Sequence, residues 1–312
     1  LAASGETAAA VRLLQASAAA HPELAAPSLE LGNLLQTESR LPEAIDAYTE
    51  ALARGPALNA ARSNRAAARL KAGDAAGALA DADAYLASGA KSANVVAYRV
   101  LALQWLGETD AARYWADVET MIYRITPDVG PGFADQLEAD IRTHQHLIDD
   151  WDPRLRAARG GKVIPDLTRD PTPTIAAFLE TVRRSVDKLA IGLPSQPDHP
   201  FFGAKPDAYR MIVWANILAS GGHQAAHIHN YGWISGVYYP SVPADIDGKS
   251  DAGWLSFGRP GYDLPAPPQL ETRSVKPEAG AMVLFPSYLW HHTVPLETGA
   301  ERLSIAFDVV PT

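Results

Sequence analysis

Small residues recur with a fixed period over the first third of the chain. Each period of 34 residues carries an alanine inside an apolar run and, five positions earlier, a turn-forming residue. The two sets are Ala10, Ala44, Ala78 and Ala112, and Gly5, Ser39, Gly73 and Gly107. Pro22 and Pro56 share the same spacing. The pattern predicts pairs of antiparallel helices that touch at the alanines, turn at the second set and end at the prolines.

The run from Pro27 to Pro56, with Leu-Gly-Asn-Leu-Leu at 31–35, resembles the tetratricopeptide repeat. The resemblance implies an all-α superhelix over residues 1–119 whose concave face binds a peptide or another protein. A dimerisation or scaffold role is the alternative. The first copy starts partway through its pattern, so we expect further sequence before Leu1.

The period is lost near residue 120, and residues 120–198 are interpreted as a helical bridge. We predict helices from Phe133 to Trp151 and from about Ile175 to Leu189, and a loop at Arg159–Lys162. Three histidines in this interval lack the spacing of metal ligands and are interpreted as structural or solvated. They are His144, His146 and His199.

Short apolar runs separated by proline and glycine dominate residues 199–312. Such runs predict an antiparallel sandwich or barrel. A jelly roll, or double-stranded β-helix, would leave a cavity large enough for a small ligand. The interval 240–274 is interpreted as a loop near the mouth of the barrel, which either covers a substrate or only connects strands. The predicted fold class is therefore α+β and multidomain, with an all-α part before an all-β part.

Composition and charge narrow the range of partners. The 312 residues carry a formal net charge of -9, and 47% of them are hydrophobic. An acidic chain without a Lys/Arg-rich run is unsuited to nucleic acid or to an anionic membrane surface. The sequence has no cysteine, which excludes disulfides and thiolate ligands and agrees with a cytoplasmic location. Neither a signal peptide nor an apolar run long enough to span a bilayer is visible.

The candidate chemistry lies in the His-Ile-His motif at 227–229. Alternate side chains of an extended segment share a face, so His227 and His229 point to the same side. His291, from a distant strand, could complete a metal site, whereas His292 would face the opposite way. Histidine nitrogens suit iron, zinc, copper or nickel. The nearest acids belong to a loop that is interpreted as solvated: Asp245, Asp247 and Asp251.

Two further stretches carry a family resemblance. They read Leu-Phe-Pro-Ser-Tyr-Leu-Trp-His-His-Thr-Val at 284–294 and Glu-Arg-Leu-Ser at 301–304. Together with His-Ile-His and Trp-Ile-Ser-Gly-Val-Tyr-Tyr at 233–239, they resemble the 2-oxoglutarate/Fe(II) oxygenases that are often fused to tetratricopeptide repeats. The resemblance covers 199–312 and implies a dioxygenase, usually a hydroxylase, that uses Fe(II), 2-oxoglutarate and O2. Its expected substrate is a peptide or protein recruited by the repeats.

The family pattern, transferred to this sequence, implies His227 and His291 as iron ligands. A planar guanidinium suits a bidentate contact with a carboxylate, so an arginine is expected at the distal carboxylate of 2-oxoglutarate. The residues expected around the co-substrate are Arg302, Ser304, Tyr239 and Asn216, with Tyr238 as the fallback for Tyr239.

The sequence departs from the family pattern at His229, because iron oxygenases of this class generally present Asp or Glu there. His229 either serves as a neutral third ligand, swings away, or belongs to a site for another metal; we favour iron with His229 bound. One alternative is a cupin-like three-histidine dioxygenase without 2-oxoglutarate, in which Arg302 would have no role. The other is a repeat adaptor whose barrel has lost turnover or only binds a ligand, which would not need both the histidines and Arg302.

Overall fold

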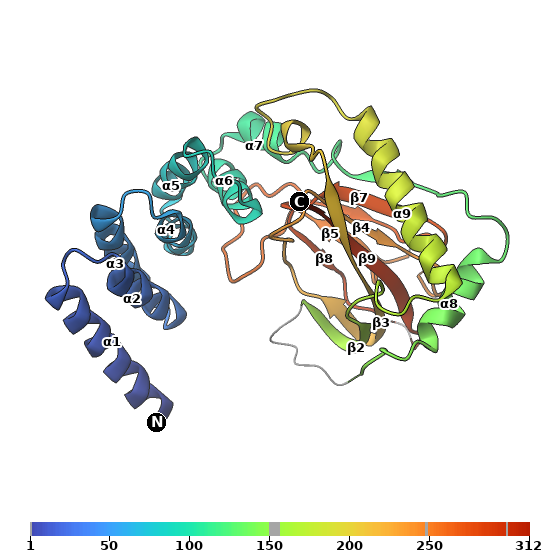
Figure 1. Cartoon of the computed structure of the whole chain (residues 1–312), viewed down its shortest axis with the longest axis horizontal. Helices are drawn as coiled ribbons and strands as arrows, with labels where there is room; N and C mark the ends of the chain where they lie inside the picture. The colour runs from blue at the N-terminus through green and yellow to red at the C-terminus, as the bar shows by residue number, and fades with distance from the viewer. Residues whose placement is uncertain (1, 150–156, 247–248, 298) are drawn as a thin grey trace. The chain divides into compact units, whose positions relative to one another are not determined.

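The computed structural model describes residues 2–149, 157–246, 249–297 and 299–312. The chain divides into two compact units. The first comprises Leu1–Arg113 with Asp263–Gln269, and the second Tyr114–Tyr262 with Leu270–Thr312. Helices occupy the first part of the chain and antiparallel sheets the last part, so the α+β class is confirmed (Figure 1). Among the described residues, no helix is both long and apolar enough to cross a membrane.

The first unit is built from consecutive helices. Their bounds are α1 (Ala2–Ala20), α2 (Ala26–Thr37), α3 (Leu41–Arg54), α4 (Asn59–Lys71), α5 (Ala75–Ala87), α6 (Ala93–Trp105) and α7 (Thr109–Trp115). From α1 to α6 each helix packs on the next one along the chain. The segment Asp263–Gln269 groups with these helices, and the Trp105 indole donates to the Pro265 carbonyl at 3.2 Å. Part of the interval predicted as a loop therefore packs on the helical unit.

The 34-residue period reappears as repeated geometry. Ser39, Gly73 and Gly107 lie between α2 and α3, α4 and α5, and α6 and α7, with φ of 58°, 82° and 76°. A positive φ favours glycine, which explains the residue type at two of these turns. The alanines that follow each turn are buried, as predicted: Ala44, Ala78 and Ala112.

The turn predicted at Gly5 is wrong, because Gly5 lies inside α1. The surrounding segment, Ala-Ala-Ser-Gly-Glu-Thr-Ala-Ala-Ala, is rich in alanine. Alanine has the highest helix propensity, and the several alanines around one glycine favour a continuous helix.

The second unit contains two antiparallel sheets. The six-stranded sheet has the order β1 (Tyr123–Ile125), β7 (Met282–Pro286), β4 (Ile234–Tyr238), β9 (Arg302–Pro311), β3 (Tyr209–Gln224) and β2 (Ala158–Ile164). The three-stranded sheet has the order β6 (Arg273–Val275), β5 (Leu255–Phe257) and β8 (His291–Thr293). Helices α8 (Phe133–Arg142) and α9 (Pro173–Gly192) pack on each other, and the 3-10 helix η2 spans Phe202–Ala204.

Residues 120–198 are not purely helical, contrary to prediction, because they supply β1 and β2 to the six-stranded sheet. The loop predicted at Arg159–Lys162 is part of β2, with a register shift between Arg159 and Gly161. The two adjacent glycines indicated a loop, but they form a bulge against β3. A Cβ on Gly161 would lie 2.2 Å from the Ile217 carbonyl oxygen, so the close approach of β3 requires glycine.

The helix predicted from Phe133 ends at Arg142, and its predicted end, Trp151, lies outside the described residues. Beyond α8 the chain turns, and Ile148 then pairs with Val163 of β2. The helix predicted from Ile175 is present as α9, whose first turn is capped by the Thr172 hydroxyl accepting from the Ile175 amide at 3.2 Å.

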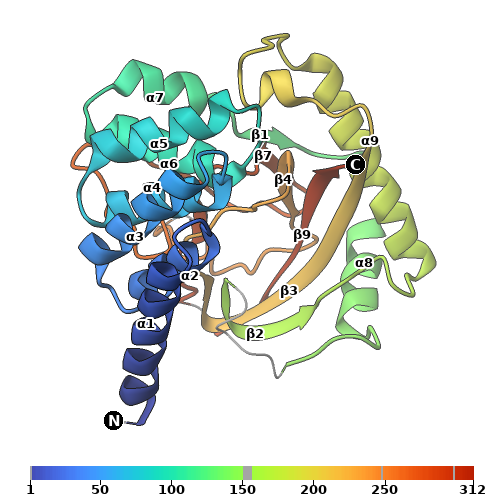
Figure 2. The same ribbon diagram turned by 60° about the vertical axis from the view of Figure 1, so that its left-hand side comes forward.

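Helix α9 covers one face of the six-stranded sheet (Figure 2). A pocket lies on the other face and is lined in part by side chains of β9. The contact includes the rings of Phe178 on α9 and Tyr238 on β4, whose centroids are 5.0 Å apart. Side chains alternate along β9, so Leu303, Ile305 and Phe307 are buried on one side. Their neighbours Arg302, Ser304 and Ala306 line the pocket on the other.

His199 has a structural role, as predicted. It is buried, its Nε2 donates to the Tyr114 carbonyl at 2.6 Å, and its Nδ1 accepts from the amides of Phe201 and Phe202 at 3.0 and 3.1 Å. Burial lowers the pKa of this imidazole. The ring therefore satisfies three backbone groups as a neutral tautomer.

Candidate metal centre and adjoining pocket

Three histidines from two distant segments meet in the second unit. His227 and His229 lie between β3 and β4, and His291 begins β8. The backbones of His227 and His291 form a β-bridge in which each amide donates to the carbonyl of the other residue at 3.0 Å. This bridge fixes the separation of the two imidazoles, because it pairs them directly across the strands.

One nitrogen from each ring converges on a common point. The candidate ligand atoms of His227, His229 and His291 all lie within 4.8 Å of one another, and the Nε2 atoms of His227 and His229 are 3.1 Å apart. His291 is buried, whereas the other two rings are partly exposed. Both predicted members of the His-x-His motif therefore point to the same place.

The opposite nitrogens decide the tautomers. His227 Nδ1 faces the Ala225 carbonyl at 2.7 Å, and His291 Nδ1 faces the Leu289 carbonyl at 2.9 Å. His229 Nδ1 is hydrogen-bonded to the Asp308 carboxylate. Carbonyl and carboxylate oxygens only accept, so each Nδ1 carries the hydrogen and each Nε2 presents a lone pair.

This arrangement fits a divalent metal ion. Two imidazole lone pairs that face each other at 3.1 Å repel unless a cation or a proton lies between them. Two ligands at about 2.1 Å from a metal and about 90° apart would be separated by about 3.0 Å. An all-nitrogen set suits iron, zinc, copper or nickel rather than magnesium or calcium.

Burial keeps His227 and His291 neutral. Desolvation, followed by the proximity of His229, lowers the pKa of His227 to about 3. Desolvation, followed by the proximity of His227 and His229, lowers the pKa of His291 well below its usual range. Neutral imidazole is the form that binds a metal, so the site is prepared for a ligand at neutral pH.

We expect the metal-free protein to lose stability as the pH falls from about 6.5 toward 3. In this window unfolded histidines bind protons that His227 and His291 cannot accept in the folded state, at a cost of up to about 1.4 kcal/mol per pH unit for each ring. Above the unfolded pKa the contribution is fully present. Melting temperatures of wild type and His227→Gln between pH 7.5 and 5 test this: equal pH slopes would contradict it.

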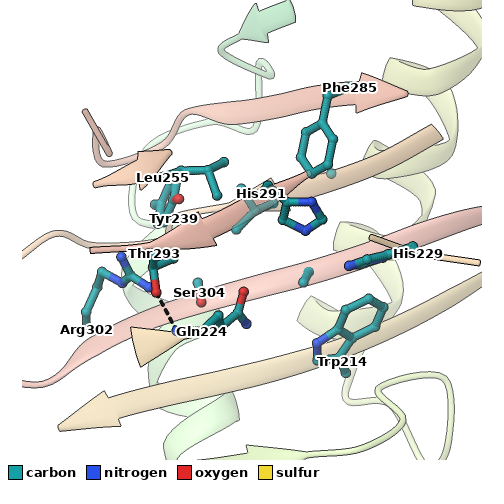
Figure 3. A pocket seen from close by; sticks show the side chains of 13 residues that line it. Trp214, Gln224, His229, Tyr239, Leu255, Phe285, His291, Thr293, Arg302 and Ser304 are labelled. Atoms are coloured by element: carbon teal, nitrogen blue, oxygen red, sulfur yellow. Dashed lines mark hydrogen bonds between the residues drawn. The ribbon is translucent and has the colours of Figure 1, made fainter. Parts of the chain in front are cut away.

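Arg302 lies on the side of the pocket opposite His229 (Figure 3). Only 1% of this residue is exposed, and its Nη1 donates to the Gly253 carbonyl. Its guanidinium carbon is 5.8 Å from the centre of the Tyr239 ring. Burial lowers the pKa of Arg302, although an arginine stays charged.

The guanidinium is incompletely paired. Its Nε has no hydrogen-bond partner, and no carboxylate among the described residues forms an ion pair with Arg302. An unpaired buried charge is costly, so the arrangement fits an anionic ligand that completes the pairing.

The other residues predicted around the co-substrate lie near Arg302. Ser304 and Tyr239 line the pocket, and both are buried. Tyr238, the fallback, points to the opposite face and packs on α9. Asn216 pairs with Ser304 across β3 and β9, and its buried Nδ2 has no partner among the described groups. Asn216 is not among the residues that line the pocket.

Sequence reasoning missed several pocket residues, namely Gln224, Leu255, Phe285 and Thr293, and Trp214 lines the pocket as well. The Trp214 ring lies 5.5 Å from that of His229. The Thr293 hydroxyl accepts from the backbone amide of Gln224 at 2.6 Å, which links the end of β3 to β8. Residues two apart on a strand point to the same face. Trp214 could therefore have been predicted from the candidate Asn216, and Thr293 from the candidate His291.

Asp308 is the acid that the sequence did not assign to the site. It lies on β9, six residues after Arg302 and therefore on the same face of the strand, and it contacts His229. Asp245 and Asp251 are exposed and do not join the histidine group, and Asp247 lies outside the described residues. His292 follows His291 but is not part of that group, as predicted.

The sequence of this region matches one protein family. Residues 212–308 match the family described as "Putative 2OG-Fe(II) oxygenase". For this segment the match confirms the predicted enzyme class, a 2-oxoglutarate-dependent oxygenase. It also supports Fe(II), 2-oxoglutarate and O2 as cofactor and co-substrates, in agreement with the three-histidine group. No curated protein sequence matches the chain.

Several solved structures are similar to this chain at low identity. A prolyl-4-hydroxylase from Pseudomonas putida is 18% identical with a TM-score of 0.41, over 63% of this chain and 96% of that chain. HygX from Streptomyces hygroscopicus, solved with nickel, 2-oxoglutarate and hygromycin B, is 15% identical with a TM-score of 0.43, over 62% and 84%. A Trichoplax adhaerens prolyl hydroxylase with a hypoxia inducible factor peptide is 14% identical with a TM-score of 0.43, over 66% and 91%. These values carry no substrate over to this chain.

Proposed function

We propose that the chain is an Fe(II)- and 2-oxoglutarate-dependent hydroxylase of a peptide or protein. One observation carries the proposal: three imidazole lone pairs converge, and two of their rings, those of His229 and His291, line the same pocket as the incompletely paired buried guanidinium of Arg302. A metal site alone would not need the guanidinium, and an anion site alone would not need the histidines. Together they match a co-substrate that bears both a metal-chelating end and a distal carboxylate.

In this proposal His227, His229 and His291 hold Fe(II). Arg302 binds the distal carboxylate of 2-oxoglutarate through its fork of N–H donors, and the hydroxyls of Ser304 and Tyr239 are further donors. Asn216, which shares a face with Ser304, contributes its unpartnered amide from the adjacent strand. When bound, the metal and co-substrate supply the oxidising chemistry, in which O2 and 2-oxoglutarate are consumed and a substrate C–H bond is hydroxylated.

The pocket walls orient the co-substrate and exclude water. Leu255, Phe285 and Trp214 contribute apolar side chains to the lining of the pocket. A low local dielectric strengthens the contact between a guanidinium and a carboxylate. The backbone bridge of His227 and His291 holds two imidazoles in place without the metal, which reduces the cost of ordering the site on binding.

We further propose that the strands of the second unit form a double-stranded β-helix, or jelly roll, centred on residues 199–312, with 120–198 as a bridge that adds strands. Residues 1–119 would be a tetratricopeptide-repeat superhelix that recruits the substrate. The left-handed turns at 34-residue spacing and the buried alanines support this interpretation. Recruitment through the concave face and a cytoplasmic location stay predictions.

Anaerobic titration of the metal-free protein with Fe(II) and then 2-oxoglutarate tests the function. We expect a visible charge-transfer absorption that needs both additions, because a keto acid chelated to the metal is required for it. Binding of Fe(II) with no response to 2-oxoglutarate would favour the cupin-like three-histidine dioxygenase. Binding of neither would leave the repeat adaptor. Peptides that increase consumption of 2-oxoglutarate would then identify the substrate class.

A further inference from the structure

The three histidines differ in what lies behind them. His227 and His291 are each supported by a backbone carbonyl, at 2.7 and 2.9 Å from Nδ1. His229 alone is supported by a carboxylate, that of Asp308. The side chains of His229 and Asp308 are only 10% and 14% exposed, so water screens the contact poorly.

The carboxylate is itself held in place. The same oxygen that faces His229 accepts from the Ser235 hydroxyl at 2.6 Å, and Ser235 and Ser287 are hydrogen-bonded at 2.8 Å. Ser235 lies directly opposite Asp308 in the pairing of β4 with β9. A carboxylate fixed by a cross-strand neighbour has little freedom to turn away from the imidazole.

Ser287 also positions the backbone of His229. The His229 amide donates to the Ser287 carbonyl at 3.0 Å, and a Cβ on Gly232 would lie 2.3 Å from the Ser287 hydroxyl oxygen. Glycine at 232 thus allows the segment that carries His229 to close onto Ser287. Backbone and ring of His229 are both positioned by one hydrogen-bonded group: Asp308, Ser235 and Ser287.

We infer that Asp308 is a positioning residue that turns His229 into a carboxylate-backed metal ligand. A carboxylate that accepts from the far nitrogen of a metal-bound imidazole fixes the tautomer and ring orientation and raises the basicity of the ligand. It also places one negative charge next to the centre. In two-histidine-one-carboxylate sites, an Asp or Glu that binds the metal directly supplies a negative charge. Here Asp308 would supply that charge through His229, without binding the metal itself. This inference rests on the proposed metal site.

The test is Co(II) binding to the metal-free full chain, measured by calorimetry and by the visible spectrum of bound Co(II). We expect Asp308→Asn to weaken Co(II) binding by about 10- to 100-fold, because the amide is neutral and supports the imidazole less strongly. Asp187→Asn is the matched control, because Asp187 lies outside the histidine group and accepts from the Tyr209 hydroxyl at 2.7 Å. The Asp187→Asn protein should bind Co(II) with wild-type affinity.

A double-mutant cycle with His229→Ala shows whether the effect passes through His229. Once the imidazole is absent, Asp308→Asn should cause no further loss of Co(II) affinity. Equal losses in both backgrounds, or wild-type affinity in Asp308→Asn, would overturn the inference while leaving the metal site intact. Absence of Co(II) and Fe(II) binding in wild type would instead overturn the proposed function and the inference with it.

Ser235→Ala provides a second variant if Asp308→Asn fails to fold. It removes a hydrogen bond to the carboxylate and keeps the charge. We expect a smaller loss of Co(II) affinity in the same direction, again absent in the His229→Ala background. An unchanged affinity in Ser235→Ala together with a correctly folded protein would count against the proposed positioning of His229.

Discussion

Arg302→Ala should reduce the affinity for 2-oxoglutarate by about 100-fold or more while Fe(II) binding persists. A hydrogen bond to a charged group contributes about 1.5–3 kcal/mol, and a bidentate contact loses two of them. Each 1.4 kcal/mol corresponds to about tenfold in affinity. Calorimetry of 2-oxoglutarate binding to the metal-loaded protein measures the loss directly, and Fe(II) binding is followed separately in the same variant.

Arg142→Ala is the matched control, because Arg142 forms ion pairs with Glu138 and Glu301 and does not line the pocket. Its affinity for 2-oxoglutarate should equal that of wild type. Arg302→Lys should recover only part of the affinity, since an ammonium cannot form the bidentate contact. Wild-type binding in Arg302→Ala would remove the basis for 2-oxoglutarate as the ligand of this pocket.

Replacing Arg302 should impair co-substrate binding without lowering the stability of the fold. Its charge is buried and lacks a carboxylate among the described residues, so an apolar residue of similar length should relieve a desolvation cost. The metal-free Arg302→Met protein is therefore expected to melt no lower than wild type, despite losing the co-substrate. A marked drop in melting temperature would mean that Arg302 mainly stabilises the fold.

His291→Ala should strongly weaken Fe(II) binding and, with it, 2-oxoglutarate turnover. His291 is the most buried of the three convergent histidines, and removing it leaves two ligands and a cavity. The bridge between residues 227 and 291 is made by backbone groups and persists in the variant. Metal content after dialysis against Fe(II) or Co(II), with circular dichroism to monitor the fold, measures the effect.

His292→Ala distinguishes a ligand from a neighbouring histidine. His292 pairs with Ser256 of β5, is half-buried and does not join the convergent group. Its pKa is lowered by burial and by Arg259, so it is neutral without contributing to the metal site. We expect His292→Ala to bind metal as wild type does. An equal loss of metal binding in His291→Ala and His292→Ala would indicate that metal binding depends on the integrity of β8 and not on the imidazole of His291.

The sequence alone determined the features that depend on local spacing. The 34-residue period predicted the turns at Ser39, Gly73 and Gly107, because small residues must recur where helices meet and reverse. The His-x-His spacing predicted that His227 and His229 share a side, and the Arg-x-Ser spacing did the same for Arg302 and Ser304. These patterns could be read directly because each spans only one element or one repeat.

The tertiary structure decided which distant residues become neighbours. Pairing with β7 and β3 made strands of β1 and β2, although the glycines of β2 indicated a loop. Asp308 came to face His229 because β9 lies between β3 and β4 in the sheet. Strand order and register are set by burial and pairing over long sequence separations, and no local pattern around His229 contains the acid that supports it.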